Sequence, residues 1–316
     1  MSRRVKIILN PVADMGNSWR VANDLRPIIY EHGGADWSGT VYPTHASELA
    51  RQAGEQGYDL VIAIGGDGTV HEVVNGLMQV PEGSRPMLGV VPVGSGNDFA
   101  HAIGVPSEAD RALTLALTGK ASNLDLGLMT DEHGRKEYFD NTLGVGFGAV
   151  VTIRSHKLPL LRGFLMYLTA VLQTIALNHD PNPMQVEVDG QALMQRNLYL
   201  ALCNGPREGG GFMVAPGAAV DDGLLNYAMI RDVSRLMMLR LVPEVMKGTH
   251  GRFSQVTLGT CRQMSVRAEQ PMYIHADGEI FTSFGSNLRQ ISFEVLPGAL
   301  RVVRGSSAGT GQPPAA

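Results

Sequence analysis

A short apolar run followed at once by a glycine-rich turn is the feature that most constrains what this chain can fold into. Residues 60–64, Leu-Val-Ile-Ala-Ile, are uncharged and typical of a buried strand. The turn after them reads Gly65-Gly66-Asp67-Gly68-Thr69, and residues 70–76 then have the pattern of a helix whose N-terminus points back at the turn. This order predicts a strand–turn–helix unit of an α/β sheet.

The turn is also suited to holding a phosphate. Its glycines allow backbone N–H groups to approach an anion closely, and a helix N-terminus favours negative charge. Asp67 adds a carboxylate that could hold a magnesium ion. The alternative is a strand-to-helix turn without a ligand. Because a single glycine would be enough for such a turn, several glycines with an acid favour a phosphate site in a nucleotide-using enzyme.

A second turn of the same kind follows the next strand. Residues 88–93 read as a buried strand and lead into Gly94-Ser95-Gly96-Asn97-Asp98. Small residues again bring the backbone close, and the side chains of Ser95, Asn97 and Asp98 add polar groups. Ligands of open α/β sheets bind outside the carboxyl ends of the strands, so the two turns are expected to line one crevice.

Three common motifs are excluded. A Walker A loop requires Gly-Lys-Ser/Thr, whereas Gly119-Lys120 is followed by Ala121. The dinucleotide fingerprint requires a third glycine where Phe99 stands, and a zincin helix requires a second histidine where Asn75 stands. The nucleotide-binding interpretation therefore depends on the two turns.

The composition limits the number of domains, the classes of partner and the cellular compartment that are expected for the chain. Its 316 residues suggest about two domains, and 44% hydrophobic against 18% charged residues are enough for sizeable cores. The net charge of −4, without a long basic run, argues against nucleic acid as a main partner. Cys203 and Cys261 match no metal-binding spacing and are expected to be buried free thiols in a reducing cytoplasm. The longest uncharged stretch, residues 163–178, is shorter than the ~20 residues that a membrane span needs.

The apolar pattern alternates between strands and helices in the first part of the chain. Expected strands cover residues 5–9, 37–42, 60–64 and 88–93. Expected helices cover residues 18–32, with Ser18 as the N-terminal cap, and residues 45–56, 70–76 and 109–117. This alternation predicts a parallel sheet with helices on both faces.

Beyond residue 125 most segments read as strands separated by turns. Expected strands cover residues 139–151, 184–188, 198–203, 224–230, 260–268 and 290–295, and a hairpin turn is expected at 188–191. Helices are expected at 163–178 and 234–247. A mostly antiparallel second domain fits this pattern. We expect an α/β nucleotide-binding domain over residues 1–125, a β-rich domain over 126–304 and a disordered tail over 305–316.

These residues carry a family resemblance. The turn at 65–69, together with Val-Pro-Val-Gly-Ser-Gly-Asn-Asp-Phe-Ala at 91–100, resembles the catalytic domain of diacylglycerol kinases and sphingosine kinases, most closely their soluble bacterial lipid-kinase relatives. Later motifs match in order, with Gly-Gly-Gly-Phe at 209–212, Asp-Asp-Gly-Leu-Leu at 221–225 and Asp-Gly-Glu at 277–279. The resemblance spans residues 5–304. It implies the fold that NAD kinases and diacylglycerol kinases share, in which the second domain receives the lipid substrate.

The resemblance also implies ATP and Mg²⁺ as cofactors and assigns roles to individual residues. The implied nucleotide contacts are Thr44, Gly65, Gly66, Asp67, Gly68, Thr69, Val70, His71, Glu72, Gly94, Ser95, Gly96 and Asn97. Asp67 would contact the catalytic magnesium ion, and Glu279 would act as the general base that accepts the proton of the substrate hydroxyl. Asp222 would hold a second, structural magnesium ion with the carbonyl groups of Ala219 and Leu224.

Each assignment has a structural alternative that the sequence leaves open. Thr44 precedes a helix and could simply cap it, and Asp67 could close an Asx turn. Asp277-Gly278 is equally suited to a hairpin turn, and Asp222 could belong to a tight turn before the strand at 224–230.

The first loop departs from the family pattern. The family usually carries a glycine, and often a lysine, after an Asn-Pro pair. Here Asn10-Pro11 leads to Gly16, but Asn17 stands where the lysine is expected. A missing cation weakens phosphate binding, and Arg20, one turn into the following helix, is the candidate to compensate.

The pattern as a whole predicts an ATP-dependent lipid kinase that phosphorylates a hydroxyl of diacylglycerol or a related lipid in a crevice between two domains. The alternatives are an NAD kinase-like enzyme with a small polar acceptor and a nucleotide-binding regulator without catalysis. The protein is expected in the cytoplasm, where it meets its lipid peripherally at a membrane surface, and a homodimer is left open. The Leu- and Met-rich segments 158–177 and 236–246 could contact acyl chains or belong to the core.

Overall fold

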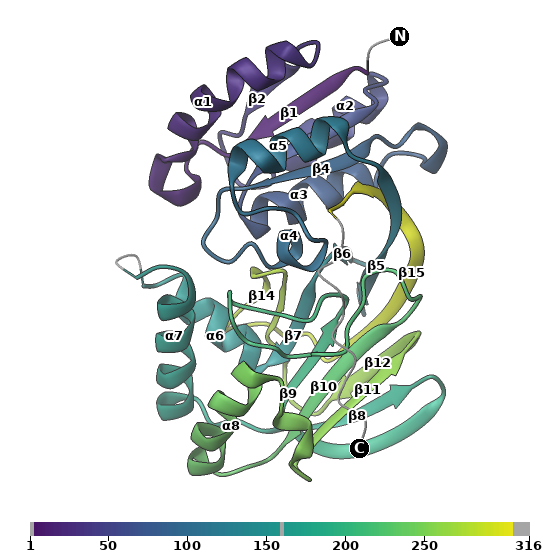
Figure 1. Ribbon diagram of the computed structural model, residues 1–316. Helices are drawn as coiled ribbons and strands as arrows, with labels where there is room; N and C mark the ends of the chain where they lie inside the picture. Colours follow the sequence, from purple (N-terminus) through teal and green to yellow (C-terminus); the bar gives the residue numbers. More distant parts are fainter. Residues whose placement is uncertain (1–2, 159–160, 306–316) are drawn as a thin grey trace, which may run out of the picture.

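Parallel strands form the sheet of the N-terminal half in the computed structural model, which describes residues 3–158 and 161–305 (Figure 1). The strands lie in the order β2-β1-β3-β4. Their bounds are β1 Val5–Leu9, β2 Asp36–Gly39, β3 Leu60–Gly65 and β4 Met87–Pro92. Every residue of β3 is buried, because a strand in the middle of a parallel sheet is covered on both faces.

Helices cover both faces of this sheet, as the alternating pattern predicts. The buried side chains of α1 (Ser18–Glu31) and α5 (Ala109–Thr118) pack with Ile7, Leu9 and Ile62 on one face. Those of α2 (His45–Glu55) and α3 (Asp67–Leu77) pack with Ile8 and Val61 on the other. The period of two residues along each strand therefore divides the apolar side chains between two cores. The short helix α4 (Asp98–Ala102) follows the second glycine-rich turn.

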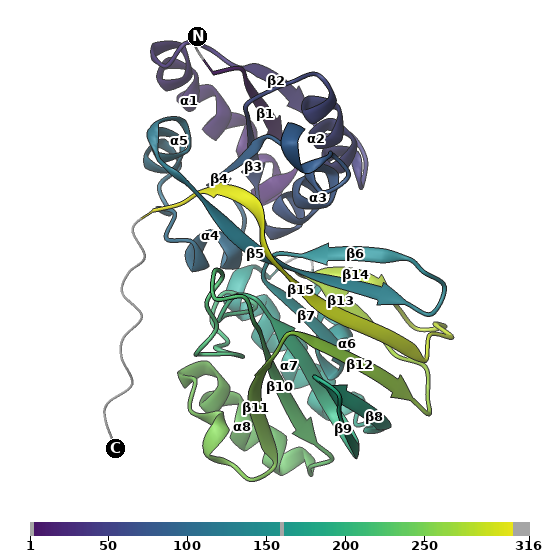
Figure 2. The ribbon, with the colours of Figure 1, turned by 90° about the vertical axis from the view of Figure 1, so that its right-hand side faces the viewer.

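The second half is a sandwich-like arrangement of mostly antiparallel strands (Figure 2). The strands are β5 Ala121–Asp131, β6 Lys136–Phe139, β7 Thr142–Gly146, β8 Asn182–Val188, β9 Gln191–Cys203, β10 Leu225–Arg231, β11 Val256–Cys261, β12 Gln263–Ala268, β13 Ile274–Ala276, β14 Glu279–Thr282 and β15 Gln290–Val303. Side chains from most of them meet in one apolar core. The helices α6 (Phe147–Ser155), α7 (Gly163–Leu177) and α8 (Arg235–Lys247) pack on β9 and β10 through a second core.

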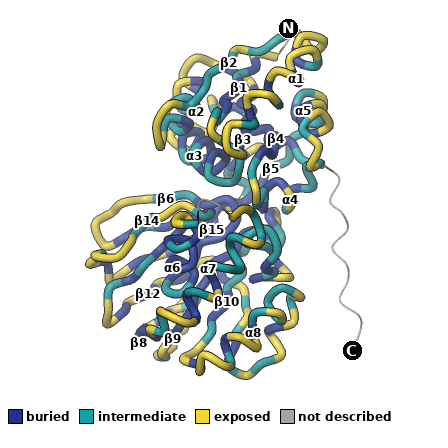
Figure 3. The backbone as a smooth tube through the Cα atoms, turned by 90° about the vertical axis from the view of Figure 1, so that its left-hand side faces the viewer, coloured by how far each residue is buried: buried dark blue, intermediate teal, exposed yellow. Residues whose placement is uncertain are grey.

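Two long strands, β5 and β15, join the halves. Leu124 and Leu126 of β5 lie in the core of the N-terminal half, whereas Met129 of the same strand lies in the core of the sandwich. Near its end β15 pairs in parallel with β4, through Val302 and Leu88. The expected boundary at residue 125 thus falls within a continuous strand, and the last strand returns to the N-terminal half. Figure 3 shows strands buried through both halves, with exposed segments on the outside.

Two of the expected strands and one expected helix cap are wrong. The strand expected at 139–151 ends at Gly146, whose φ of 78° turns the chain into α6. The β-branched residues of α6 favour a strand locally, but burial on nearly all sides outweighs that preference. The strand expected at 260–268 is divided at Arg262, where the Asp189 carboxylate accepts the N–H groups of Arg262 and Gln263. Ser18 is the first helical residue rather than the cap, and its hydroxyl donates to the carbonyl of Asn10 at 2.7 Å.

Most of the remaining expected elements agree with the structure to within a few residues, but β9 begins seven residues before the expected strand at 198–203 and β15 ends eight residues after the expected strand at 290–295. The sequence pattern does not predict β5, β6, β11, β13, β14 or α4 as separate elements. The hairpin at 188–191 is confirmed, with Asp189 and Gly190 at positive φ. The tail expected at 305–316 lies outside the described residues apart from Gly305. Within the described part of the chain, no helix combines the length and the apolar character that crossing a bilayer would require.

Candidate active site

The two glycine-rich turns meet at the carboxyl edge of the parallel sheet. β3 and β4 are parallel neighbours, with Gly65 opposite Pro92, so both strands end at the same edge of the sheet. A Cβ atom on Gly94 would overlap the Cα atom of Gly66, which means that the turns approach each other as closely as only glycine permits. Asn97 closes the second turn, because its amide group accepts from Gly94 N at 3.0 Å and donates to Gly94 O at 2.8 Å.

The first turn is shorter than the sequence suggests. Helix α3 begins at Asp67 rather than at Val70, so Asp67, Gly68 and Thr69 form its first turn. The unpaired N–H groups of a helix start, together with the helix dipole, favour an anion at this position. The N-terminus of α3 therefore supplies the backbone donors that were expected from a loop.

Asp67 has one oxygen engaged and one that faces the second turn. Its Oδ1 accepts the N–H groups of Asp98 at 2.7 Å and Phe99 at 3.3 Å, and so caps α4. A Cβ on Gly96 would lie 2.8 Å from Oδ2, which places that oxygen beside the opposite turn. Burial, and then the negative charge of Asp98, raise the pKa of Asp67 to about 7. A divalent cation held at Oδ2 would stabilise the ionised form, so the residues present fit a magnesium ion here.

A loop from the second half holds the second turn in place. Arg207 donates from Nε to Asp98 Oδ1 at 2.7 Å and from Nη2 to Gly96 O at 3.3 Å. The N–H of Gly210 also donates to the Asp98 carboxylate, at 3.1 and 3.2 Å. The glycine motif at 209–212 thus has a structural role, which is to bring the backbone N–H of Gly210 to an acid in the other half of the molecule.

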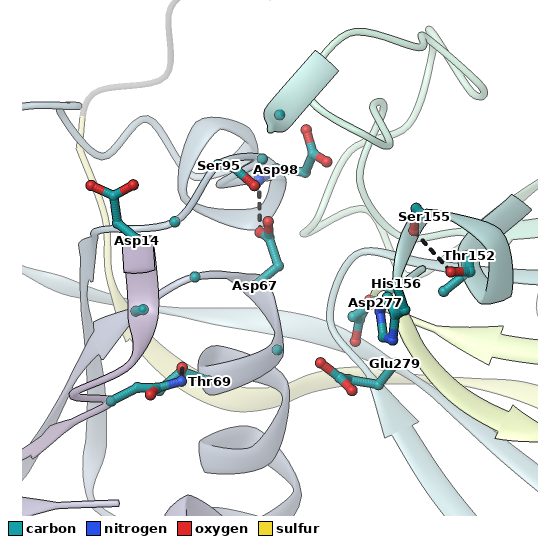
Figure 4. Close-up of a pocket in the computed structure, with 18 of the residues that line it drawn as sticks. Asp14, Asp67, Thr69, Ser95, Asp98, Thr152, Ser155, His156, Asp277 and Glu279 are labelled. Carbon is teal, nitrogen blue, oxygen red and sulfur yellow. Dashed lines mark hydrogen bonds between the residues drawn. The ribbon is translucent and has the colours of Figure 1, made fainter. Parts of the chain in front are cut away.

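Glu279 faces the first turn from the opposite side of the cleft (Figure 4). It is the first residue of β14, and the turn before it contains Asp277 and Gly278 at φ values of 51° and 83°. The hairpin turn that the sequence left open as an alternative is therefore present, and it positions Glu279 at the cleft. A Cβ on Gly68 would overlap the Glu279 carboxylate, so that carboxylate lies against the start of α3. Desolvation by the walls of the cleft raises the pKa of Glu279. This effect outweighs the positive charges of His71 and His156, which would lower that pKa.

His71 connects α3 to the strand turn that carries Glu279. It lies buried, and donates from Nδ1 to Asp277 at 2.8 Å and from Nε2 to Glu137 at 2.9 Å. Asp277 in turn accepts the N–H groups of Asp140, Asn141 and Thr142. Burial alone would lower the pKa of His71, but the hydrogen bonds with Asp277 and Glu137 and the charges of these acids raise it well above its usual value.

Replacing His71 by glutamine is expected to lower the free energy of unfolding by about 3 kcal/mol at low pH, because a buried acid loses its cationic partner. The folded pKa of His71 lies above its unfolded value of about 6.5, so its contribution is fully present below that pH. It is lost as the pH rises through the folded pKa. Urea unfolding of wild type and His71→Gln from about pH 5.5 to 9.5 should show a difference that shrinks as the pH rises.

The matched control is His133→Gln, because His133 is exposed on the turn between β5 and β6. This variant should match the wild type throughout the pH series. A stability difference between wild type and His71→Gln that stays constant with pH would contradict a protonated His71.

The N-terminus of α2 lies beside the cleft and is capped by Glu72. Thr44, which the sequence left open as a cap, does not form the capping bond. Thr44 occupies the N-cap position at a φ of 72°, but its side chain forms no capping bond. The carboxylate of Glu72 accepts the N–H groups of Thr44 at 2.8 Å and Ala46 at 3.0 Å. Thr44 therefore does not cap the helix through its hydroxyl, and Glu72 fixes α2 to α3.

The cation expected at the first loop comes from the second half of the molecule. Asn17 donates to Asp14 Oδ2 at 3.0 Å, and Arg162, just before α7, donates to Asp14 Oδ1 at 3.0 Å. Asp14 and Met15 have φ values of 48° and 54°, so the loop is held in a conformation that is unusual outside glycine. Arg162, rather than Arg20, brings positive charge to the rim of the cleft.

The turns, the first loop and the Glu279 strand enclose a cleft of about 780 Å³ between the two halves. Of the residues expected to bind nucleotide or act in catalysis, the cleft is lined by Gly66, Asp67, Gly68, Thr69, Glu72, Gly94, Ser95, Gly96 and Glu279. Those placed behind its walls or beside it are Thr44, Gly65, Val70, His71 and Asn97. Sequence reasoning missed three partners of these residues, namely Arg207, Arg162 and Glu137, and it identified Asp98 only as a polar group of the second turn.

The residues expected to hold a second metal ion lie in the loop before β10, outside the cleft lining. Asp222 Oδ1 accepts the N–H of Leu224 at 3.0 Å and closes a tight turn. Asp125 accepts the N–H groups of Gly223 and Gly298, each at 2.7 Å, and fixes this loop to β15. The described residues contain no cluster of three or more His, Cys, Asp or Glu side chains arranged for a metal ion.

Two family models match the chain, one in each half. The model described as the diacylglycerol kinase catalytic domain matches residues 4–129. The model described as the YegS C-terminal NAD kinase beta sandwich-like domain matches residues 141–304. Together they cover nearly all of the described structure.

Several curated proteins are similar over most of their length. A diacylglycerol kinase of Mycobacterium tuberculosis is 30% identical over 306 residues, which covers 95% of each chain. A diacylglycerol kinase of Bacillus subtilis is 30% identical over 284 residues, covering 88% of this chain and 90% of its own. A Chromohalobacter salexigens protein named "Probable lipid kinase YegS-like" is 36% identical over 256 residues, covering 80% of this chain and 78% of its own.

Solved structures share the fold. The crystal structure of a diacylglycerol kinase from Bacillus anthracis superposes with a TM-score of 0.73 at 20% identity, covering 97% of this chain and 98% of its own. A second crystal structure from the same organism superposes with a TM-score of 0.80 at 22% identity, covering 97% of each chain. The predicted two-domain architecture is therefore confirmed.

Proposed function

This chain belongs to the diacylglycerol kinase family and is a lipid kinase, and we propose that its donor is ATP, its metal ion Mg²⁺ and its acceptor a hydroxyl group of diacylglycerol or a closely related lipid. The observation that carries the proposal is the meeting of two phosphate-suited turns with a carboxylate from the other half of the molecule across one cleft. Phosphoryl transfer requires that the donor is held, that the charge on the phosphates is neutralised and that the acceptor is oriented.

The N-terminal half supplies the donor site. Backbone N–H groups at the start of α3 and at Ser95 and Gly96 would hold the phosphates, because the two turns converge there. When bound, Mg²⁺ would neutralise negative charge on the phosphates beside Asp67. Arg162 adds a positive charge at the rim of the cleft, where the first loop lacks its expected lysine.

The second half supplies the proton acceptor. The Glu279 carboxylate lies against the start of α3, so a lipid hydroxyl that enters the cleft beside it would be in reach of both the carboxylate and a phosphate held at the helix N-terminus. Glu279 would accept the hydroxyl proton as the oxygen attacks phosphorus, and its raised pKa makes it a stronger base than an ordinary glutamate. The network around His71 and Asp277 holds this strand turn in position.

An apolar pocket beside the cleft favours a lipid acceptor over a polar one. It lies between α6, α7, α8 and the strands β9 and β10, and it shares Tyr167 and Glu208 with the cleft. Its apolar lining consists of Phe147, Val151, Val171, Ile175, Leu198, Phe212, Val214, Ile230, Met238, Leu241, Val242 and Val245. The pocket has a volume of about 80 Å³, so it could bury the end of an alkyl chain, whereas the polar groups of a second nucleotide would find no partners there.

The proposal is tested with γ-labelled ATP, Mg²⁺ and a panel of acceptors that includes diacylglycerol, a long-chain base and NAD. We expect label in a phospholipid that migrates as phosphatidate. Label in NADP without label in lipid would favour the NAD kinase-like alternative. Binding of ATP without transfer to any acceptor would favour a regulator.

The structural magnesium site and the location of the protein remain parts of the same proposal. A cation held by the Asp222 carboxylate and the carbonyl groups of Ala219 and Leu224 would join three points of the loop before β10 and so stabilise it. The protein would act in the cytoplasm and meet its lipid at a membrane surface.

A further inference from the structure

We propose that Glu208 makes this enzyme prefer acceptor lipids that carry a second hydrogen-bond donor beside the hydroxyl that is phosphorylated, an inference that rests on the proposed lipid-kinase function. The second donor is a hydroxyl or an N–H group, as in a monoacylglycerol or an N-acylated amino alcohol. Diacylglycerol has no second donor, because its other two oxygens are esterified. It would remain an acceptor, but with a lower kcat/KM.

Glu208 lies where the polar cleft meets the apolar pocket. It lines both cavities, as does Tyr167. Glu279, the proposed base, lines the same cleft, whereas the apolar pocket could bury the end of an alkyl chain. A lipid with its reacting hydroxyl at Glu279 and its chain in the pocket would therefore pass Glu208 with the groups between these two ends. Those groups are the ones in which acceptor lipids differ.

The carboxylate of Glu208 is ionised although the residue is only 6% exposed. Nε2 of His275 lies 3.0 Å from its Oε1, and the hydroxyl of Tyr199 donates to its Oε2 at 3.3 Å. Burial would raise the pKa of Glu208, but the charge of His275 and hydrogen bonds with the neighbouring side chains hold that pKa below its ordinary value. A negative charge therefore stands at the junction of the two cavities.

This carboxylate has hydrogen-bonding capacity that the described residues leave unused. An ionised carboxylate can accept about four hydrogen bonds. The contact between His275 and Oε1 lacks hydrogen-bond geometry, and within residues 3–158 and 161–305 no other group donates to Oε1. Rotation about the last side-chain bond, which is soft in a glutamate, can turn either oxygen toward a ligand. A ligand with a donor would fill the unused capacity, whereas ester oxygens, which only accept, would be repelled.

The position of this acid is set by the fold. The N–H of Glu208 donates to the carbonyl of Phe212 at 2.8 Å, which fixes the loop that carries the acid. His275 lies on β13, and a Cβ atom on Gly144 of the neighbouring strand β7 would overlap its Nε2. The glycine therefore leaves the space in which the imidazole stands beside the carboxylate. A site that is held in this way can discriminate between ligands that differ in one polar group.

The test uses two pairs of short-chain acceptors in which only the second donor differs. A monoacylglycerol is compared with the derivative whose second hydroxyl is methylated, and an N-acylethanolamine is compared with its N-methylated derivative. The kcat/KM of each acceptor is measured with γ-labelled ATP and Mg²⁺. Wild type is expected to prefer the donor-bearing member by about tenfold or more, as for a hydrogen bond to a charged group. The first pair reports a hydroxyl donor and the second an N–H donor, and a preference in either pair is sufficient.

Glu208→Gln keeps the shape of the side chain and removes its charge. It should reduce the preference by at least about fivefold, because a charge-assisted hydrogen bond is about twice as strong as a neutral one. The preference is a ratio measured on one sample, so a loss of folded protein cancels. If Glu208→Gln does not fold, Glu208→Gln/His275→Gln, which leaves no unpaired charge, takes its place. The matched control is Glu244→Gln on α8, where the acid pairs with Arg252 outside the lining of both cavities.

The outcomes separate this inference from the proposed function. A preference that is present in wild type and in Glu244→Gln, and reduced in Glu208→Gln, supports the role of Glu208. Equal kcat/KM within both pairs in wild type, or an unchanged preference in Glu208→Gln, overturns that role and leaves the lipid-kinase function intact. If wild type phosphorylates neither these acceptors nor diacylglycerol, the proposed function fails and the role of Glu208 fails with it.

Discussion

Replacing Glu279 by glutamine is expected to lower kcat for lipid phosphorylation by about 10²–10⁴-fold, the range for loss of a general base. Glutamine keeps the size and the hydrogen-bonding shape of the side chain but cannot accept a proton. The side chain lies against the start of α3, but the N–H groups that would hold the nucleotide are backbone groups of the other half of the molecule, which the substitution does not remove. The KM for ATP should therefore change little. Steady-state kinetics with varied ATP and saturating lipid separate the two parameters.

The pH dependence of the reaction provides a second readout of the same residue. The Glu279 side chain is accessible to solvent, but desolvation by the surrounding walls of the cleft raises its pKa, so its carboxyl becomes protonated, and inactive as a base, at a higher pH than an ordinary glutamate. The activity of wild type should fall as the pH drops through this raised pKa. The residual activity of Glu279→Gln should not show this fall at low pH. The control is Glu294→Gln on β15, which lies outside the cleft lining. Full activity of Glu279→Gln would remove Glu279 from the role of base.

Replacing Asp67 by asparagine is expected to lower kcat by about 10²–10³-fold and to raise the Mg²⁺ concentration needed for activity. Asparagine keeps an oxygen that can accept the N–H groups of Asp98 and Phe99, so the cap of α4 survives. Only the negative charge is removed. Since burial already disfavours that charge in the absence of a cation, the free energy of unfolding should stay close to that of wild type.

Asp67→Ala distinguishes the two functions of this side chain. It removes both the charge and the cap, so it should lose stability as well as activity, by about 1 kcal/mol for a helix cap. Activity titrated with Mg²⁺ and urea unfolding, measured for both variants, give the comparison. If Asp67→Asn retained wild-type kcat and Mg²⁺ dependence, the role of Asp67 would be limited to capping α4.

Local patterns predicted most of the fold. The strand, turn and helix around residues 60–76 are specified by apolar runs and glycines that act within a few residues of one another. The errors arise where distant contacts decide. Helix α6 has β-branched residues that favour a strand, and it is helical because it is buried between α7, β7 and β9. Strand β5 was missed because its ends belong to different cores, which no local pattern reports.

In the site, too, features set by neighbouring residues could be predicted, and features set by distant contacts could not. The two turns and the acid at Glu279 could be identified from motifs, because each motif is contiguous. The partners could not. His71 lies 206 positions from Asp277, Arg207 lies 109 from Asp98, and Arg162 lies 148 from Asp14. These contacts depend on how the second half folds back on the first. Likewise, the Leu-rich segment at 158–177 could contact acyl chains or belong to the core, and the structure shows that α7 has a buried inner side and exposed leucines at 165 and 172 on its outer side. Contact with acyl chains stays a prediction.

The most direct test of the central claim is a crystal structure of Glu279→Gln with Mg²⁺ and a non-hydrolysable ATP analogue. We predict that the γ-phosphate lies against both glycine-rich turns at the start of α3, with the metal ion beside Asp67 and the residue 279 side chain facing the phosphate. A nucleotide bound outside the cleft, or a γ-phosphate directed away from residue 279, would contradict the account.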